Sequence, residues 1–153
     1  MFRSILVALD GSPAAAAALN RAIDLARDEG ARLTLIGVAV PLRWRPAGPF
    51  YVPFPSDDEL ERQAQEILDR AAEDVPDDIP VWTVVRRGDP AKAILERVEQ
   101  GEHDLVVMGS RGFGRAASLL LGSVSRAVVA RSPVPVLIAR ADAARTPEKA
   151  MAV

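Results

Sequence analysis

Residues 104–123 read DLVVMGSRGFGRAASLLLGS, in which a short apolar run leads into a stretch rich in glycine. A continuous apolar run is typical of a strand that is buried on both faces of a parallel sheet. Glycine lets backbone N–H groups approach an anion closely, and the unpaired N–H groups of a helix N-terminus point toward such an anion. The order of strand, glycine loop and helix start therefore predicts an α/β fold with a phosphate site at a strand end.

The same alternation of strands and helices extends over most of the chain. We expect strands at residues 5–9, 32–40, 81–86, 104–108 and 134–139, separated by helices that begin near Pro13, Asp57, Pro90 and Ser123. Ser12 and Asp89 stand where N-caps are expected, each directly before a proline that suits the first helical position. The alternation predicts a single-domain three-layer sandwich around a five-stranded parallel sheet. Pro135 has no N–H for a central strand to use, which places the last strand at a sheet edge.

The composition narrows the class of protein. With 153 residues the chain has the length of one domain, and its formal net charge of -2 gives no basic field for nucleic acid. It contains no cysteine and one histidine, which argues against disulfides and against a zinc or iron site built by the protein. No apolar stretch reaches the ~20 residues of a membrane span, and no signal-peptide pattern opens the chain. We therefore expect a cytoplasmic protein that binds neither nucleic acid nor membrane.

Two segments depart from the alternation. Residues 41–56 contain five prolines and four aromatic residues, which predicts an irregular loop that packs against the domain, a ligand or a second subunit. Residues 141–153 look polar and are expected to form a flexible C-terminal tail. The domain itself is therefore expected to span residues 1–140.

Two strand ends carry residues that suit a ligand site. Asp10 and Gly11 follow the first strand, and Gly109 follows the fourth. In parallel sheets, ligands bind beyond the carboxyl ends of the strands, at the point where the strand order reverses. If the first and fourth strands are neighbours, both features meet in one crevice. The glycine loop lacks the lysine of a Walker A motif and the glycine fingerprint of dinucleotide-binding proteins. Judged by the spacing of its glycines alone, the loop is either a phosphate site or a flexible turn between the strand and the helix.

Together with these features, the loop resembles the nucleotide-binding branch of the universal stress protein family. The family motif is Gly-x-x-Gly, nine residues, then Gly with Ser or Thr; here Gly109 and Gly112 are followed, after residues 113–121, by Gly122 and Ser123. The resemblance extends from ILVALDGS at residues 5–12 to SPVPVLI at residues 132–138. It implies an ATP-binding universal stress protein with strand order 3-2-1-4-5, the Rossmann-like arrangement of the adenine nucleotide alpha hydrolases.

The resemblance also implies which positions hold the nucleotide. The residues expected around the base and ribose are Ala8, Leu9, Asp10, Val38, Met108 and Gly109, with Val38 against the adenine. Those expected around the phosphates are Gly112, Gly122, Ser123, Val124 and Ser125, with Arg111 as a candidate neighbour. The expected cofactor is ATP, or AMP or ADP, with Mg²⁺ as a further candidate.

Elementary electrostatics assigns compatible roles to the charged residues. Asp10 repels phosphate but suits the hydrogen-bond donors of adenine or ribose, or a magnesium ion; its alternative role is to cap the first helix. Arg111 and Arg115 suit phosphate, with a solvated arginine as the alternative. His103 precedes the fourth strand, at the opposite end from the crevice, and is expected at the surface or against a helix end.

The sequence offers few groups for catalysis. It shows no P-loop lysine, no Ser/His/Asp arrangement and no paired carboxylates at motif spacing, so we expect a regulatory nucleotide-binding protein rather than an efficient enzyme. One alternative is an interaction module of the same family that binds no nucleotide. Another is a protein that slowly hydrolyses ATP or phosphorylates itself at Ser123 or Ser125. The apolar last strand, residues 134–139, predicts a homodimer through this edge.

Overall fold

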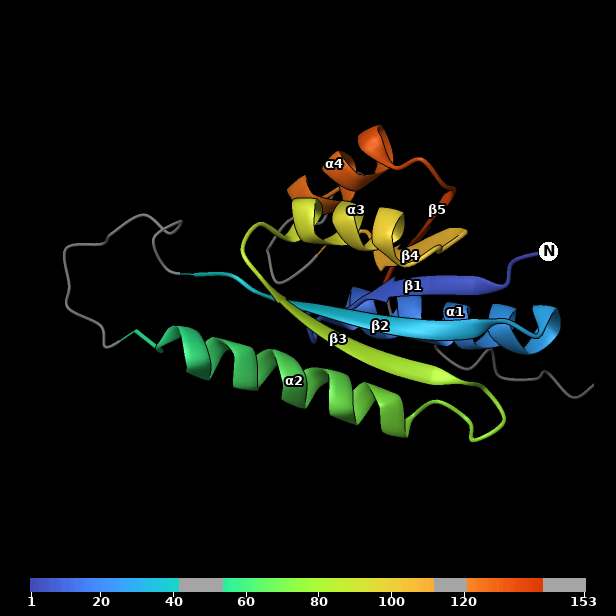
Figure 1. Ribbon diagram of the computed structural model, residues 1–153, viewed down its shortest axis with the longest axis horizontal. Helices are drawn as coiled ribbons and strands as arrows, with labels where there is room; N and C mark the ends of the chain where they lie inside the picture. The colour runs from blue at the N-terminus through green and yellow to red at the C-terminus, as the bar shows by residue number, and fades with distance from the viewer. Residues whose placement is uncertain (42–53, 112–120, 142–153) are drawn as a thin grey trace, which may run out of the picture.

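Strands and helices alternate along the chain in the computed structural model, which describes residues 1–41, 54–111 and 121–141 (Figure 1). The strands are β1 (Ser4–Ala8), β2 (Arg32–Ala39), β3 (Val81–Arg87), β4 (Leu105–Gly109) and β5 (Val136–Ala139). The helices are α1 (Pro13–Glu29), α2 (Asp57–Glu73), α3 (Pro90–Gln100) and α4 (Ser123–Arg131). Most of the expected loop at 41–56 and nearly all of the expected tail at 141–153 lie outside the described residues.

All of these strands run parallel, in the order β3-β2-β1-β4-β5, which confirms the predicted sheet and its strand order. β1 lies between β2 and β4. The chain therefore adds its second and third strands on one side of β1 and its fourth and fifth strands on the other side. Among the described strands, β5 pairs with β4 alone, at the sheet edge that Pro135 predicts.

The last strand begins at Val136 rather than at the predicted Val134. The Ser132 hydroxyl donates to the Val134 carbonyl at 2.8 Å, and the Val134 N–H donates to the same hydroxyl oxygen at 3.2 Å. This local turn keeps Val134 out of the sheet. Pro135, which has no N–H, contacts β4 through its carbonyl, which accepts the Val106 N–H at 3.0 Å.

Helices cover both faces of the sheet. α1 and α2 share an apolar core with one face, in which Leu33 and Leu68 are fully buried. α3 and α4 share a second core with the opposite face, around Leu6, Ile94 and Val128. Figure 1 shows α2 on one side of the sheet and α3 and α4 on the other. The predicted three-layer sandwich is confirmed.

Helix starts follow the predicted capping pattern. Ser12 Oγ accepts the Ala15 N–H at 3.2 Å, and Asp89 Oδ1 accepts the Lys92 N–H at 2.8 Å. Each cap satisfies one of the backbone donors that a helix start leaves unpaired. These caps fix where α1 begins after β1 and where α3 begins after β3, at the carboxyl ends of the strands.

His103 lies at the amino-terminal end of β4. The helix starts described above lie at the other end of the sheet, where the strands have their carboxyl ends. Its side chain is 5% exposed and its Nδ1 lies 2.9 Å from Ser4 Oγ, so the expected surface position is wrong. The alternative of a helix-end contact is confirmed, because a Cβ at Gly101, the C-cap of α3, would come within 2.5 Å of His103 Nε2. Burial, together with the charges of Arg97 and Arg32, lowers the pKa of His103 to about 4.

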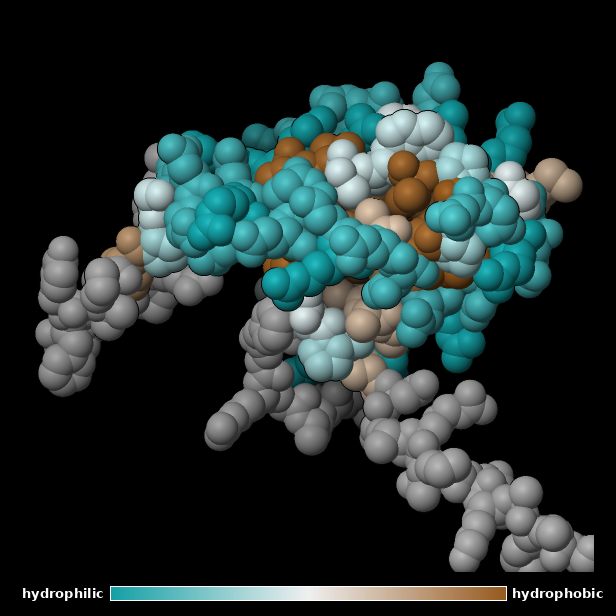
Figure 2. Space-filling view, turned by 90° about the horizontal axis from the view of Figure 1, so that it is seen from below, coloured by the Kyte–Doolittle hydropathy of each residue, from teal (hydrophilic) through white to brown (hydrophobic). Residues whose placement is uncertain are grey.

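Hydrophilic residues dominate the side of the molecule on which α2 lies (Figure 2). Arg87, at the end of β3, forms ion pairs with Asp57, Asp58 and Glu61 at 3.3, 3.5 and 2.7 Å. These pairs join the first turns of α2 to the carboxyl end of β3.

In the described ranges, no helix combines the length and the apolar character that a membrane span requires.

Candidate functional site

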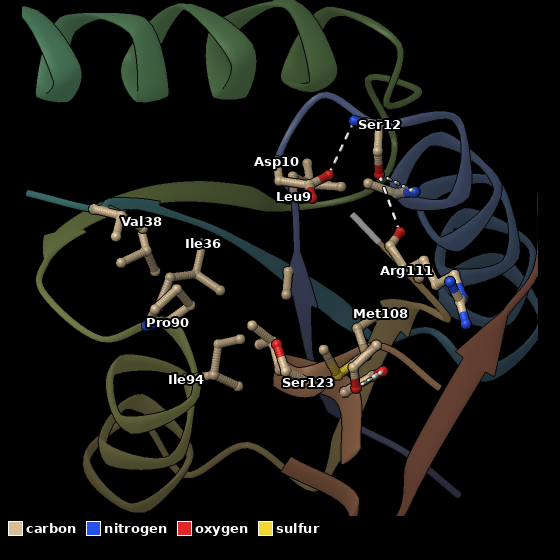
Figure 3. Close-up of a pocket in the computed structure, with 17 residues that line it drawn as sticks. Leu9, Asp10, Ser12, Ile36, Val38, Pro90, Ile94, Met108, Arg111 and Ser123 are labelled. Atoms are coloured by element: carbon tan, nitrogen blue, oxygen red, sulfur yellow. Dashed lines mark hydrogen bonds between the residues drawn. The ribbon is translucent and has the colours of Figure 1, made fainter. Parts of the chain in front are cut away.

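A cavity of about 410 Å³ lies at the carboxyl ends of β1 and β4. This volume is within the range of small-molecule sites in proteins. Its walls come from β1, β2 and β4, from the turns that follow β1 and β4, and from the first turns of α1, α3 and α4 (Figure 3). The described residues that line it are Ala8, Leu9, Asp10, Ser12, Ala15, Ile36, Val38, Val40, Pro90, Ile94, Met108, Gly109, Arg111, Gly122, Ser123, Val124 and Ser125.

Eleven of the twelve residues that the family resemblance places around a ligand line this cavity, and the twelfth, Gly112, lies outside the described residues. Arg115 also lies outside them. The eleven residues come from three distant parts of the chain: residues 8–10, residue 38, and residues 108–111 together with 122–125. They are joined by the pairing of β1 with two strands, in which Ala8 is in register with Ile36 on one side and with Met108 on the other. The reversal of strand order at β1 gathers the candidate residues in one place.

One end of the cavity is apolar. Ile36, Val38 and Val40 line it. Ile36 and Val38 are two residues apart in β2, which puts their side chains on the same face of the sheet, and Val40 follows the end of this strand. Pro90 and Ile94, from the first turns of α3, lie beside Ile36 and Val38 in Figure 3. Apolar walls of this kind suit a flat ring system better than a charged group, because an unpaired charge loses its hydration there.

The turn after β1 brings polar atoms to the cavity. Asp10 Oδ1 accepts the Ser12 N–H at 2.9 Å, while Ser12 Oγ caps α1. The cap is therefore Ser12, and the Asp10 carboxylate supports the turn in front of it. The Ser12 hydroxyl also lies 3.5 Å from the Arg111 carbonyl oxygen, which links this turn to the loop after β4. The Arg111 side chain lies at the opposite end of the cavity from Val38 (Figure 3).

Gly109 is required by the packing of a helix. A Cβ at this position would come within 2.8 Å of the backbone carbon and the Cβ of Ala14, in the first turn of α1. Real Cβ atoms essentially never come this close to backbone atoms. Because α1 lies so close to the end of β4, any side chain at this position would require α1 to move, whatever else Gly109 contacts.

The N-terminus of α4 opens onto the cavity without a side-chain cap. Its N-cap is Gly122, which has no side chain to accept hydrogen bonds from the first turn. Ser123 and Val124 follow it and line the cavity. The first N–H groups of a helix have no partner within the helix, and the helix dipole adds partial positive charge at this end. This end of the cavity is therefore suited to an anion.

These features agree with a comparison to known protein families. The family model described as "Universal stress protein family" matches residues 1–140. The chain belongs to the universal stress protein family. A named relative, the universal stress protein YxiE of Bacillus subtilis, is 36% identical over 148 residues, which cover 92% of this chain and 100% of that protein.

Solved structures show the same fold for this universal stress protein. The hypothetical protein MJ0577 has a TM-score of 0.76 at 24% identity, covering 92% of this chain and 96% of that one. A universal stress protein solved in complex with cAMP has a TM-score of 0.60 at 28% identity, covering 90% of this chain and 96% of that one. Structural relatives of this chain therefore include a protein that binds an adenine nucleotide.

Six residues that line the cavity of this universal stress protein are missing from the sequence prediction: Ser12, Ala15, Ile36, Val40, Pro90 and Ile94. A signal exists for some of them. In the strand expected at residues 32–40, Ile36 and Val40 share the face of Val38 through their spacing of two, and Pro90 opens a helix that starts at the carboxyl end of a strand. Ile94 carries no such signal, because a buried apolar helix residue is expected in any core.

Proposed function

We propose that this universal stress protein binds an adenine nucleotide in the cavity, with ATP as the principal ligand and AMP and ADP as alternatives. The observation that carries the proposal is that an apolar surface and an uncapped helix N-terminus open into the same cavity. A nucleotide matches both, since the faces of its base are apolar and its phosphates are anionic. The cAMP bound by a relative at 28% identity supports the same class of ligand.

The two ends of the cavity suggest the orientation of the nucleotide. The base would lie against Val38 at the apolar end, and the phosphates would lie at the N–H groups of Ser123 and Val124. Asp10 would repel phosphate, so its carboxylate suits the hydroxyl donors of the ribose. Arg111 supplies positive charge away from the base.

Magnesium, if it accompanies ATP, would be held mainly by the phosphates. Among the described residues that line the cavity, Asp10 is the one that carries a carboxylate. The described ranges contain no group of three or more His, Cys, Asp or Glu residues that could hold a metal ion. Mg²⁺ commonly binds through one or two carboxylates together with the phosphates of its nucleotide. As the alternative to its role at the ribose, Asp10 is the residue that this protein would contribute, because a bound magnesium ion would offset the repulsion between its carboxylate and the phosphates.

We propose a regulatory role in the stress response rather than efficient catalysis. A hydrolase needs a base that activates water and groups that stabilise the leaving phosphate. Among the described residues that line the cavity, Asp10 is the one carboxylate base, and its Oδ1 already accepts the Ser12 N–H at 2.9 Å. Occupancy of the cavity by nucleotide would then be the signal that a partner protein in the cytoplasm reads.

We also propose a homodimer through the edge of β5 that no other described strand pairs with. This strand pairs with β4 on one side, and an edge strand presents N–H and C=O groups that a second chain can pair with. Sedimentation of the full chain at micromolar concentration is expected to give the mass of two chains. A monomeric mass would contradict this part of the proposal.

Native mass spectrometry tests the ligand and the subunit count together. The full chain, purified without denaturant or supplied with ATP, is expected to carry an adenine nucleotide that is released on unfolding. A protein that stays empty at millimolar ATP would refute nucleotide binding and would favour an interaction module that needs no ligand.

A further inference from the structure

Ser125 is a buried residue in the first turn of α4. It is 2% exposed, and its Oγ lies 3.0 Å from the Ser110 carbonyl oxygen and 3.1 Å from the Gly122 carbonyl oxygen. A serine hydroxyl has one proton to donate, and both of these neighbours are acceptors. The hydroxyl proton is therefore directed to the backbone, although Ser125 belongs to the residues that the family resemblance places around phosphate.

The Ser110 carbonyl joins the loop after β4 to the start of α4. It accepts the Gly122 N–H at 2.8 Å in addition to the Ser125 hydroxyl. The Ser110 N–H donates to the Ala139 carbonyl at 2.7 Å, which fixes Ser110 to the end of β5. Through Ser110, the first turn of α4 is thereby attached to the carboxyl end of the sheet.

We propose that Ser125 is a positioning residue, which holds the N-terminus of α4 so that the N–H groups of Ser123 and Val124 are presented to the cavity before a phosphate arrives. This inference rests on the proposed nucleotide binding and assigns its phosphate affinity to a residue that does not touch the phosphate. Donors that are ordered in advance lose less conformational entropy when the ligand binds. Without the Ser125 hydroxyl, the first turn of α4 would keep the Gly122 N–H bond to the Ser110 carbonyl but would be held less firmly, and phosphate binding would have to supply the remaining order.

Three variants separate this role from a direct contact with phosphate. Ser125→Ala removes the hydroxyl but leaves the Ser110 carbonyl with the Gly122 N–H, so we expect the variant to fold. Ser125→Thr keeps a hydroxyl and is expected to restore the wild-type behaviour. Ser132→Ala is the matched control, since it removes a hydroxyl that donates to the Val134 carbonyl at 2.8 Å, at the other end of α4 and outside the cavity.

Two measurements on the full chain are needed: affinity for AMP and for adenosine by calorimetry, and hydrogen exchange of the Gly122 amide by NMR in ligand-free protein. For Ser125→Ala we expect AMP binding to weaken by about 3–10-fold and adenosine binding to change by less than about twofold. We expect exchange of the Gly122 amide to become about tenfold faster, because the first turn of α4 opens more often. Ser125→Thr and Ser132→Ala are expected to match the wild type in both measurements.

Other results would contradict either the role proposed for Ser125 or the proposed nucleotide binding. Weaker AMP binding with unchanged Gly122 exchange would mean that Ser125 contacts phosphate directly, which overturns the inference. Faster exchange with unchanged AMP affinity would also overturn it, because the position of α4 would then not govern phosphate binding. A wild-type protein that binds neither AMP nor adenosine would refute the proposed function, and this inference with it, whatever the exchange rates.

Discussion

Ala8 of β1 lies in register with Met108 of β4, although the two residues are far apart in the sequence. This pairing brings together the turns that follow the two strands, so that the Ser12 hydroxyl lies 3.5 Å from the Arg111 carbonyl oxygen. The cavity lies at this junction, where the strand order reverses. The location of the site is therefore a consequence of the sheet topology, as expected for parallel α/β sheets.

Gly109→Ala is expected to destabilise the protein. The new Cβ would come within 2.8 Å of Ala14 backbone and side-chain atoms, so α1 would have to move away from β4. Overpacking of this kind costs about 1–3 kcal/mol of unfolding free energy, which urea denaturation can measure. Gly37→Ala is the control, because its Cβ would meet the Leu68 side chain at 3.3 Å and need only a small shift. Equal losses for both variants would contradict this reading of Gly109.

Val38→Ala is expected to weaken binding of ATP and of adenosine by the same factor. Val38 lines the apolar end of the cavity, where the base is proposed to lie. Removal of its two methyl groups costs up to about tenfold in affinity for any ligand that carries the base. Val84→Ala, on β3 and outside the cavity, is the matched control for calorimetry. An effect on ATP alone would place the base elsewhere.

Gly122→Leu is expected to weaken ATP binding while adenosine still binds. A Cβ at Gly122 would lie 3.4 Å from the Ser110 carbonyl oxygen, so Gly122→Ala is tolerated, but a longer side chain obstructs the approach of phosphate to the first turn of α4. We expect about tenfold or greater loss of ATP affinity for leucine and a small change for alanine. Circular dichroism checks that both variants fold. Unchanged ATP affinity in the leucine variant would exclude this helix N-terminus as the phosphate site.

The stability of the protein is expected to fall between about pH 6.5 and about pH 4 because of His103. The pKa of His103 is about 4 in the folded protein, below its ordinary value of 6.5. In this window the unfolded chain binds a proton that the folded protein does not, so lower pH favours unfolding. From about pH 7.5 to about pH 5 the loss reaches up to about 2 kcal/mol in urea denaturation. His103→Gln should show a smaller loss over this range; an equal loss would assign the effect to other groups.

The sequence was sufficient to predict the elements, the sheet and most of the candidate site. Helix starts such as Ser12 and Asp89 are local signals, because an N-cap bonds within its own first turn. The strand order came from the family motif around Gly109 and Gly122 together with the opening segment. The order then places the carboxyl ends of β1 and β4 side by side, and with them the residues named from the motif.

The remaining features depend on contacts between distant segments. The burial of His103 requires its contact with Ser4 and with the end of α3, which no local pattern contains. The need for glycine at 109 comes from Ala14 in a different element. The Ser125 hydroxyl bonds the Ser110 carbonyl across the segment between them. Local propensities indicate which element a residue belongs to, and tertiary packing decides what its side chain contacts.

The central claim is that the cavity at the carboxyl ends of β1 and β4 binds an adenine nucleotide, with its phosphates at the N-terminus of α4. Equilibrium dialysis of the full chain against labelled ATP, in parallel with Gly122→Leu, tests this claim most directly. We predict that wild-type protein, freed of bound nucleotide, retains one ATP per chain below about 1 mM free ATP, and that Gly122→Leu retains much less. No retention by the wild type, or equal retention by the two proteins, would contradict the claim.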